Sequence, residues 1–522
     1  MTTTSASPST STPTRLADLV AAFSLAIDLA TGQPLEHTLR TCLLSVDLAR
    51  RSGVGSDDLR QVYDVALLRF SGATAASAET SAAVGDDLAF TSGMGPAFMG
   101  SSSEQLRAAM RSSGAGDPAP RRARHRVRAL WARHDIRPAV AAHVEAAAEF
   151  ARRLGMSDEV VAALAHAFER WDGRGVPGTR EAEEVPAAVR VATVARDIDL
   201  WQRVGGAEAA TAVVRARAGR GYDPTVAAAF LLAPDEVLRA TATPDAWQEV
   251  LDLEPDPPRW VDADAIDEVL RVFADFADLK SPWLRGHSAG VAELAGEAAE
   301  AAGLDELSAR RLRRAGLVHD LGRVAVANTV WDRPGDLTET DREWVREHPY
   351  LAERILARSA ALAPLGRLAA DHHERADGSG YPRGTRSMDP CLEESLLAAA
   401  DTFHALTEPR PHRPAIAHPR AGEHLVREVA AGRLPREAVE AVLVAADHMP
   451  PRRRGVWPGG LTDREVDVLR LVVRGESHRD IAADLGLASR VVATYVNEVY
   501  EKLGVQTRAG AALFAMHHGL LT

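Results

Sequence analysis

The chain has 522 residues, and this length predicts two to four domains. A hydrophobic share of 46% and a charged share of 26% are typical of globular chains and exclude disordered, collagen-like and fibrous classes. The formal net charge of −12 argues against a protein that coats nucleic acid or an anionic membrane, so any nucleic-acid contact should be local. The two cysteines, Cys42 and Cys391, cannot form a disulfide framework and fit a reducing compartment.

Almost the whole chain is predicted to be helical, because apolar residues recur three and four apart between Gly, Pro and Asp clusters. We expect an all-α protein with two helical bundles in tandem and a small four-helix domain. The predicted divisions are a disordered tail over 1–14, a first block over 15–250, a linker over 251–264, a second block over 265–449, a linker over 450–457 and a C-terminal domain over 458–522. No stretch approaches ~18 consecutive apolar residues, so we expect a cytoplasmic protein without membrane contact.

The two large blocks repeat each other, which is the main organisational feature of the sequence. At an offset of 250 residues the equivalent pairs are His37 with His287, Arg69 with His319 and Phe70 with Asp320. At an offset of 205 the equivalent segments are His143 with His348 and ERWDGRGVP at 169–177 with ERADGSGYP at 374–382. The first block therefore carries about 45 extra residues between Gly72 and His143.

The second block contains five histidines and two aspartates that could bind metal. They are His287, His319, Asp320, His348, His372, His373 and Asp401. A lone histidine on a helix is usually a surface or core residue, but seven such groups in one helical block favour divalent iron, manganese or zinc. Asp320 directly follows His319, so its carboxylate could bridge two cations about 3.5–4 Å apart, a pair that polarises a phosphoryl group. The set therefore predicts phosphoester hydrolysis.

The strings HDLGR at 319–323 and HHERADGSGYP at 372–382 resemble the HD-GYP division of the HD phosphohydrolases. The resemblance covers roughly 265–445. It implies an all-helical domain with a binuclear metal centre that hydrolyses cyclic di-GMP to linear pGpG, and both tandem bundles would then be of the HD type. The implied partner is a cyclic dinucleotide, and the implied cofactors are two divalent ions, with iron as the first choice and manganese or zinc as alternatives.

The resemblance also assigns roles to individual residues. One metal would be held by His287, His319, Asp320 and Asp401. The second, which Asp320 would also reach, would be held by His348, His372 and His373. The implied catalytic residues are Asp320 and Arg323, the latter in place of the family's usual lysine. The implied substrate contacts are Arg323, Tyr381, Arg410 and Arg413, although a solvated loop is an equal alternative for the last two. Trp283 stands where trinuclear members have a glutamate, which disfavours a third metal.

The first block lacks five of the seven ligand positions under the same alignment. Arg69–Phe70 replaces the His-Asp pair, Ala167–Phe168 replaces the paired histidines, and Arg196 replaces the last aspartate. Two remaining histidines beside two arginines cannot assemble a dinuclear cation site, because like charges repel. We expect a degenerate HD-GYP-like repeat with a structural, dimerising or ligand-sensing role.

The C-terminal domain has the pattern of a helix-turn-helix. Thr462 and Glu465 have capping-box spacing, a second helix is expected around 479–485, and a third over about 489–503. The elements LTDRE, IAADL and KLGVQTR resemble the LuxR-type helix-turn-helix domain. The candidate DNA contacts are Arg490, Thr494, Asn497, Lys502 and Arg508. Because 461–522 contains seven Lys/Arg and eight Asp/Glu, we expect weak or dimer-dependent DNA binding.

Three hypotheses remain open from the sequence. The first is a metal-dependent cyclic-dinucleotide phosphodiesterase, with cyclic di-GMP as the expected substrate, that is fused to a DNA-binding output and acts as a homodimer. The second is a transcription regulator whose HD-GYP-like block senses a ligand without useful turnover. The third is a phosphohydrolase for another nucleotide or phosphomonoester.

Overall fold

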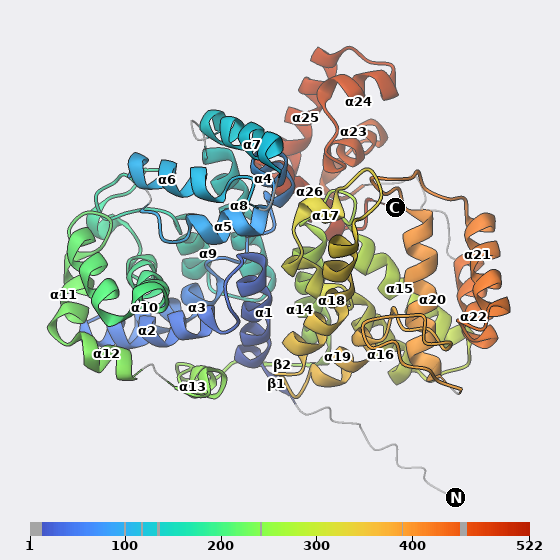
Figure 1. Ribbon diagram of the computed structural model, residues 1–522, viewed down its shortest axis with the longest axis horizontal. Coiled ribbons are helices and arrows are strands. Elements are labelled where there is room, and N and C mark those ends of the chain that lie inside the picture. Colours follow the sequence, from blue (N-terminus) through green and yellow to red (C-terminus); the bar gives the residue numbers. More distant parts are fainter. Residues whose placement is uncertain are drawn as a thin grey trace, which may run out of the picture.

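The computed structural model describes residues 13–98, 101–115, 118–132, 136–240, 243–388, 390–448 and 457–521. Within these ranges the chain is helical apart from short irregular segments and one antiparallel pairing of β1 (Thr14–Arg15) with β2 (Trp260–Val261). The prediction of an all-α protein is therefore confirmed. Figure 1 shows two groups of helices side by side, with the C-terminal helices above them.

The first block is built around long helices with an apolar face. Its helices are α1 (Leu16–Ala30), α2 (His37–Arg51), α3 (Leu59–Leu68), α4 (Ser77–Val84), α5 (Asp87–Met94), α6 (Ser102–Ser112), α7 (Ala119–Ala132), α8 (Arg137–Arg153), α9 (Asp158–Ala165), α10 (Ala187–Arg217), α11 (Pro224–Leu232), α12 (Pro234–Ala240) and α13 (Ala246–Asp252). Helices α4 to α7 lie between Gly72 and His143, where the first block carries about 45 residues more than the second.

Three helices of the second block start with a side-chain capping signal, at Asp262, Asp305 and Thr338. Its helices are α14 (Ala263–Asp278), α15 (His287–Ala301), α16 (Glu306–Val318), η3 (Leu321–Ala325), α17 (Asn328–Trp331), α18 (Glu339–Leu356), α19 (Ala363–Ala370), α20 (Leu392–Thr407), α21 (His418–Ala430) and α22 (Arg436–His448). Asp305 accepts a hydrogen bond from the backbone N–H of Ser308 at the start of α16, and Thr338 with Asp341 forms a capping box at the start of α18.

Local structure is repeated at the two offsets that the sequence predicts. Asp28 accepts hydrogen bonds from the backbone and hydroxyl of Thr38, and Asp278 accepts the same pair from Ser288, 250 residues later. A Cβ atom at Gly322 would lie 2.0 Å from the carbonyl oxygen of His348. A Cβ at Gly72 would lie 2.0 Å from that of His143, so each block needs glycine at this close helix contact.

The two blocks share one continuous apolar core. The ring of Phe23 in α1 stacks on Phe273 in α14, with 5.0 Å between the ring centroids. Buried charges also cross the boundary, because Lys280 donates to the carboxylate of Asp87 at 2.8 Å and Arg153 to that of Asp275 at 2.6 Å. Segments far apart in the sequence therefore fold as one body.

The segment predicted as a linker over 251–264 is structured. It contains the end of α13, the strand β2 and the start of α14, and β2 pairs with β1 near the beginning of the chain. Arg15 reaches across this pairing and forms an ion pair with Glu254 at 2.7 Å. Of the predicted tail, residues 1–12 lie outside the described residues, whereas Thr14 belongs to β1.

The C-terminal domain folds as the sequence predicts. Its helices are α23 (Asp463–Val473), α24 (His478–Leu485), α25 (Ser489–Leu503) and α26 (Arg508–His517). The capping box of Thr462 with Glu465 is present, and Gly486 ends α24 in the left-handed conformation. Val492, Val496 and Val499 are buried and form the core face of α25. The second predicted linker, 450–457, lies outside the described residues except for Trp457.

The C-terminal domain packs against both large blocks through α26, which contacts α8 and α14. Glu145 of α8 accepts hydrogen bonds from the backbone of Gln506 and the hydroxyl of Thr507. Arg285 of the second block donates to the carbonyl of Val473.

None of the helices in the described ranges combines the length and apolar character needed to cross a bilayer.

Candidate metal centre

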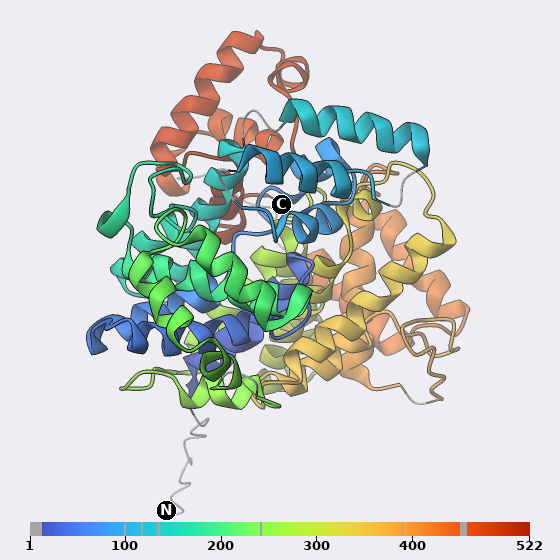
Figure 2. The same cartoon turned by 60° about the vertical axis from the view of Figure 1, so that its left-hand side comes forward.

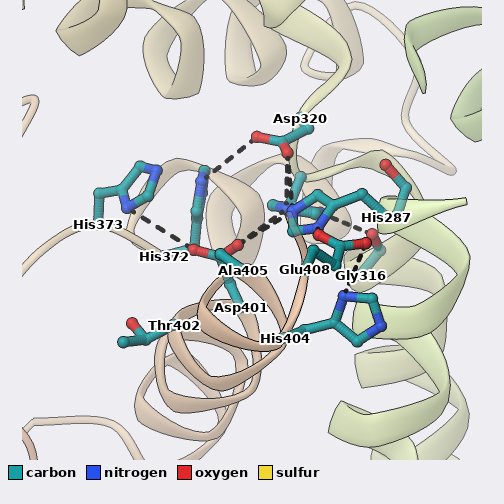
Figure 3. Close-up of polar contacts among 12 residues, drawn as sticks. His287, Gly316, Asp320, His372, His373, Asp401, Thr402, His404, Ala405 and Glu408 are labelled. Atoms are coloured by element: carbon teal, nitrogen blue, oxygen red, sulfur yellow. Dashed lines mark hydrogen bonds and ion pairs between the residues drawn. The ribbon is translucent and has the colours of Figure 1, made fainter. Parts of the chain in front are cut away.

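The seven predicted ligand side chains converge in one region of the second block. Figure 3 labels five of them, namely His287, Asp320, His372, His373 and Asp401. His287 is the first residue of α15, and His319–Asp320 joins the end of α16 to η3. His348 lies in α18, His372–His373 follows α19, and Asp401 lies in α20. Six of the seven side chains are buried, and His373 is half-buried.

The carboxylate of Asp320 lies between two groups of imidazoles. Its Oδ2 atom is 3.0 Å from Nε2 of His319 and 3.4 Å from Nε2 of His287. Its Oδ1 atom is 3.2 Å from Nε2 of His348 and 3.7 Å from Nε2 of His372. One oxygen therefore faces each group, as a carboxylate that bridges two cations requires.

Each group has a further member. Asp401 completes the first group, since its Oδ1 atom lies 3.2 Å from Nε2 of His287. In the second group, His348, His372 and His373 offer nitrogen atoms within 4.8 Å of one another, and the Nε2 atoms of His348 and His372 are 3.3 Å apart. Two ligand atoms that bind one tetrahedral ion at about 2.0–2.2 Å lie about 3.4 Å apart, close to the distance between the Nε2 atoms of His348 and His372.

Backbone carbonyls orient three of the histidines. The Nδ1–H group of His319 donates to the carbonyl of Gly316 at 2.7 Å. The Nδ1–H groups of His348 and His372 donate to carbonyls three residues earlier, each at 2.6 Å. These contacts direct each Nε2 atom toward Asp320. In the neutral imidazole, the outer hydrogen bond at Nδ1 fixes the tautomer that binds a cation.

The fourth histidine is oriented by a carboxylate that the sequence reasoning missed. Nδ1 of His287 lies 2.8 Å from Oε2 of Glu408, just after α20. Oε1 of Glu408 lies 3.4 Å from Nδ1 of His404, one helical turn earlier. The spacing of His404 and Glu408 was visible in the sequence, but Glu408 lies 121 residues from His287 and only the fold joins them.

Burial and charged neighbours shift the pKa values of these groups in opposite directions. Burial would raise the pKa of Asp320, but the charges of Arg323 and His319 hold it well below its usual value. Burial would lower the pKa of His319, but the carboxylates of Asp320 and Asp401 raise it to about 9. Burial lowers the pKa of His372 to about 3, so this imidazole is neutral at pH 7 and can accept a cation.

The residues fit a binuclear metal centre. Nε2 of His319 and both carboxylate oxygens of Asp320 are buried and form no hydrogen bond of good geometry, although Oδ2 of Asp320 forms an ion pair with Arg323. Such unsatisfied buried atoms are rare in folded proteins, and here they face one another at the middle of the cluster. Two divalent cations would satisfy them, and imidazole with carboxylate but no thiolate suits iron, manganese or zinc.

Arg323 and Tyr381 both contact the cluster. Nη1 of Arg323 lies 2.7 Å from Oδ2 of Asp320, and its guanidinium lies 5.2 Å from the centroid of the Trp331 ring. The ring of Tyr381 lies against the imidazole of His373, with 4.6 Å between centroids and an interplanar angle of 32°. Tyr381 thus supports a predicted ligand directly, and its contact with a guanine stays a prediction.

The two predicted phosphate-binding arginines have different surroundings. Arg410 donates to the carbonyl of Trp283 at 2.9 Å and to the carboxylate of Glu408 at 2.8 Å, beside the first group of ligands. Arg413 donates to backbone carbonyls in and just after the last turn of α20. Arg413 therefore provides hydrogen-bond donors for the free carbonyl groups at the end of α20, a role that the sequence did not predict. Its contact with a phosphate stays a prediction.

The equivalent region of the first block is filled by aromatic and arginine side chains. The rings of Phe70, His143 and Phe168 pack edge to face, with centroid distances of 4.9, 6.0 and 6.1 Å. Arg69 donates to the hydroxyl of Thr193 at 2.6 Å, and burial lowers its pKa to about 10. Among the described residues, the groups of side chains placed to hold a metal all lie within 287–408.

The predicted DNA contacts divide into two sets. Arg490, Thr494 and Asn497 are exposed on α25. Nζ of Lys502 instead lies 2.7 Å from the carboxylate of Glu465 within the domain. Nη1 of Arg508 lies 3.6 Å from a carboxylate of the first block. The accessible polar face of α25 is therefore formed by the first set.

Two families match separate parts of the chain. Residues 271–434 match the HD domain family, and residues 460–515 match the bacterial regulatory proteins of the luxR family. The first match contains all seven predicted ligands, and the second contains the candidate DNA contacts.

Relatives extend this similarity over most of the chain. A 3'3'-cGAMP-specific phosphodiesterase 3 of Vibrio cholerae is 29% identical over 407 residues, which cover 77% of this chain and 88% of that protein. A cyclic di-GMP phosphodiesterase of Thermotoga maritima is 33% identical over 164 residues, which cover 31% of this chain and 43% of that protein. The crystal structure of a V. cholerae cyclic GMP-AMP specific phosphodiesterase (V-cGAP3) shares the fold, with a TM-score of 0.58 and 24% identity over 84% of this chain and 99% of that chain.

Proposed function

We infer the function of this chain from the two families its parts belong to: it contains an HD domain over 271–434 and a LuxR-type helix-turn-helix domain over 460–515. We propose that the HD domain is a metal-dependent phosphodiesterase for a cyclic dinucleotide and that the LuxR-type domain binds DNA. The position of Asp320, whose two oxygens face two separate groups of histidines, carries the first proposal. The names of the relatives support the class of substrate.

The seven predicted ligand side chains would bind two cations. One cation would be held by His287, His319, Asp320 and Asp401, and the other by Asp320, His348, His372 and His373. A pair of divalent cations supplies Lewis-acid polarisation of a phosphoryl group and lowers the pKa of water. The chain itself fixes the imidazole tautomers through backbone carbonyls and Glu408, so that the ligand atoms are already in position before any ion binds.

Three further side chains would position the substrate. Arg323 holds its guanidinium beside Asp320, from which its planar fork can turn to a phosphate oxygen. Arg410 keeps a second positive charge next to the ligand cluster. Tyr381 packs on His373 at the edge of the centre, where its ring can also contact a base. These roles depend on a substrate that approaches from the side of the centre occupied by Arg323 and Tyr381.

The proposal also includes which cyclic dinucleotide the HD domain hydrolyses. The sequence resemblance implies cyclic di-GMP, whereas the relative that matches 77% of this chain is named for 3'3'-cGAMP. The relative named for cyclic di-GMP matches 31% of the chain. We therefore propose 3'3'-cGAMP as the preferred substrate, with cyclic di-GMP as the alternative.

Product analysis with matched variants tests the phosphodiesterase. The full chain, purified without oxygen and loaded with Fe²⁺ or Mn²⁺, is incubated with each cyclic dinucleotide and the linear products are identified by mass spectrometry. The variant H319A/D320A should lose both metal and turnover, whereas His166→Ala in the first block should keep both. Binding of a cyclic dinucleotide without any linear product would favour the ligand-sensing alternative.

The first block is proposed to be a degenerate HD-GYP-like repeat with a structural role. The repeated contacts at Asp28 and Asp278, and at Gly72 and Gly322, support this relationship. Its helices complete the apolar core of the HD domain, so its removal would expose Phe273. The aromatic cluster in place of the ligands explains why it would not bind a metal pair.

The geometry also supports communication between the metal centre and the DNA-binding domain. A cavity of about 760 Å³ lies between them, lined by His404 and Glu408 on one side and by Arg470 and Arg474 on the other. Arg285, two residues before His287, holds the carbonyl of Val473. We propose that ligand binding or turnover changes this contact and thereby the pairing of two chains on an inverted-repeat site. Sedimentation of the chain with and without cyclic dinucleotide measures the proposed homodimer.

A further inference from the structure

The first block contains a strongly basic helix that neither the metal centre nor the shared core uses. Helix α7 carries five arginines and one histidine among its 14 residues, and it has no acidic residue. The arginines are Arg121, Arg122, Arg124, Arg126 and Arg128. The whole chain has a formal net charge of −12, so this concentration of one sign is local. A helix that serves only solubility usually mixes both signs of charge.

The basic face of α7 is exposed. Arg121, Arg124 and Arg128 are exposed and are spaced three and four residues apart, so they lie along one face of the helix. At a rise of about 1.5 Å per residue this row is about 10 Å long, which corresponds to roughly three base-pair steps of a duplex at about 3.4 Å each. Arg122 is also exposed and adds charge beside the row.

Helix α7 lies next to the LuxR-type domain. Figures 1 and 2 both show α7 at the same end of the molecule as α24 and α25. A cavity of about 880 Å³ is bordered by Ala129 of α7 and by residues 506–509 of the C-terminal domain. Helix α4, which packs against α7, carries the carboxylate of Glu79 that faces Arg508 at 3.6 Å. Helix α7 and the LuxR-type domain therefore border the same cavity.

The LuxR-type domain has little positive charge of its own. The segment 461–522 contains seven Lys/Arg and eight Asp/Glu, and the ammonium of Lys502 is paired with Glu465. Attraction to phosphate groups supplies most of the sequence-independent affinity for DNA. A duplex on the exposed face of α25 would thus gain little from the domain itself, while five arginines stand at the same end of the molecule.

We propose that α7 is a second DNA-contacting element, whose arginines bind backbone phosphates of the duplex that the LuxR-type domain holds. This inference rests on the proposed DNA binding by that domain. It assigns a role to the extra segment of the first block, because this segment holds the basic helix at the end of the molecule where the LuxR-type domain lies. Since phosphate contacts carry no sequence information, α7 contributes affinity and orientation, and α25 contributes selectivity.

The salt dependence of DNA binding by the full chain tests this role. The probe is a mixed-sequence duplex of about 40 base pairs, titrated by fluorescence anisotropy between about 30 and 300 mM KCl. The basic-helix variant replaces Arg121, Arg124 and Arg128 by glutamine, which keeps helix propensity. The matched control replaces three exposed arginines on α21 and α22, namely Arg420, Arg427 and Arg436, by glutamine. A third variant, Arg490→Ala, alters the face of α25.

The basic-helix variant should lower the slope of log K against log salt by about 1 for each lost phosphate contact, up to about 3, and the control should match the unchanged chain. Equal slopes for the basic-helix variant and the unchanged chain, with a loss only in Arg490→Ala, would overturn the inference and leave DNA binding by the LuxR-type domain intact. No binding by the unchanged chain at any salt concentration would overturn both. A variant that binds the duplex normally but loses binding to anionic vesicles would assign α7 to membranes and also overturn the inference.

Discussion

Replacing Glu408 should weaken metal binding, because this carboxylate orients the predicted ligand His287. Its Oε2 atom accepts from Nδ1 of His287 at 2.8 Å and from Arg410 at 2.8 Å. Its Oε1 atom lies 3.4 Å from Nδ1 of His404. Without Glu408 the imidazole of His287 can rotate or take the other tautomer, and Nε2 is then no longer held toward Asp320.

The structure predicts a graded series of effects. Loss of an outer partner of this kind lowers metal affinity by about 10- to 100-fold, or about 1.4 to 2.7 kcal/mol. In Glu408→Gln, the two donors that converge on Oε2 can still share one amide oxygen, so the loss should be about tenfold. In Glu408→Ala no acceptor remains for either donor, and the loss should approach about 100-fold.

Competition with a chromogenic chelator measures these affinities. The full chain and its variants are titrated with Mn²⁺ or Zn²⁺ in the presence of the chelator, and two binding steps are fitted. Glu423→Gln, an exposed change on α21, serves as the control and should not alter either step. Equal affinity of Glu408→Ala and the unchanged chain would refute the reasoning that Glu408 orients His287.

Three further predictions concern stability. Asp87→Ala should lower the free energy of unfolding by about 3–5 kcal/mol, because it strips the counter-ion from the fully buried ammonium of Lys280; a loss under about 1 kcal/mol in chemical denaturation would contradict this. Burial raises the pKa of Asp28 to about 7, so the folded chain keeps a proton that the unfolded chain releases near pH 4. The free energy of unfolding should therefore fall as the pH rises from about 4 to about 7. Asp28→Asn should flatten this dependence and gain stability at about pH 8, whereas an unchanged profile would count against the buried carboxyl as its source. Thr462→Ala removes the capping box of α23 and should destabilise that helix by about 1 kcal/mol, visible as faster amide hydrogen exchange; unchanged exchange would speak against it.

Local signals in the sequence predict local structure well. The third helix of the C-terminal domain was expected over about 489–503 and is observed as Ser489–Leu503, because Gly504 ends it and the valines repeat at helical spacing. Four of the seven metal ligands lie in the strings HDLGR and HHERADGSGYP, which identify them from the sequence. His348 and Asp401 lie within α18 and α20, and only the fold brings them to the other ligands.

Features that depend on packing between distant segments could not be predicted. Glu408 has no motif of its own, and only the meeting of α15 with the end of α20 gives it His287 as a partner. The pairing of β1 with β2 joins residues near opposite ends of the first block, and no local pattern within 251–264 predicts it. The buried pair of Lys280 with Asp87 crosses between blocks, and Arg413 turns to the end of α20 rather than outward. Each depends on tertiary contacts that carry no local pattern.

The binuclear centre is tested by the metal content of the full chain purified without oxygen, compared with that of Asp320→Asn. The unchanged protein should contain about two divalent ions per chain, because one oxygen of Asp320 faces each group of ligands. The amide that Asp320→Asn introduces cannot bridge two cations, so the variant should retain at most one. An unchanged protein that binds no divalent ion, or a folded variant that retains both, would contradict the binuclear centre.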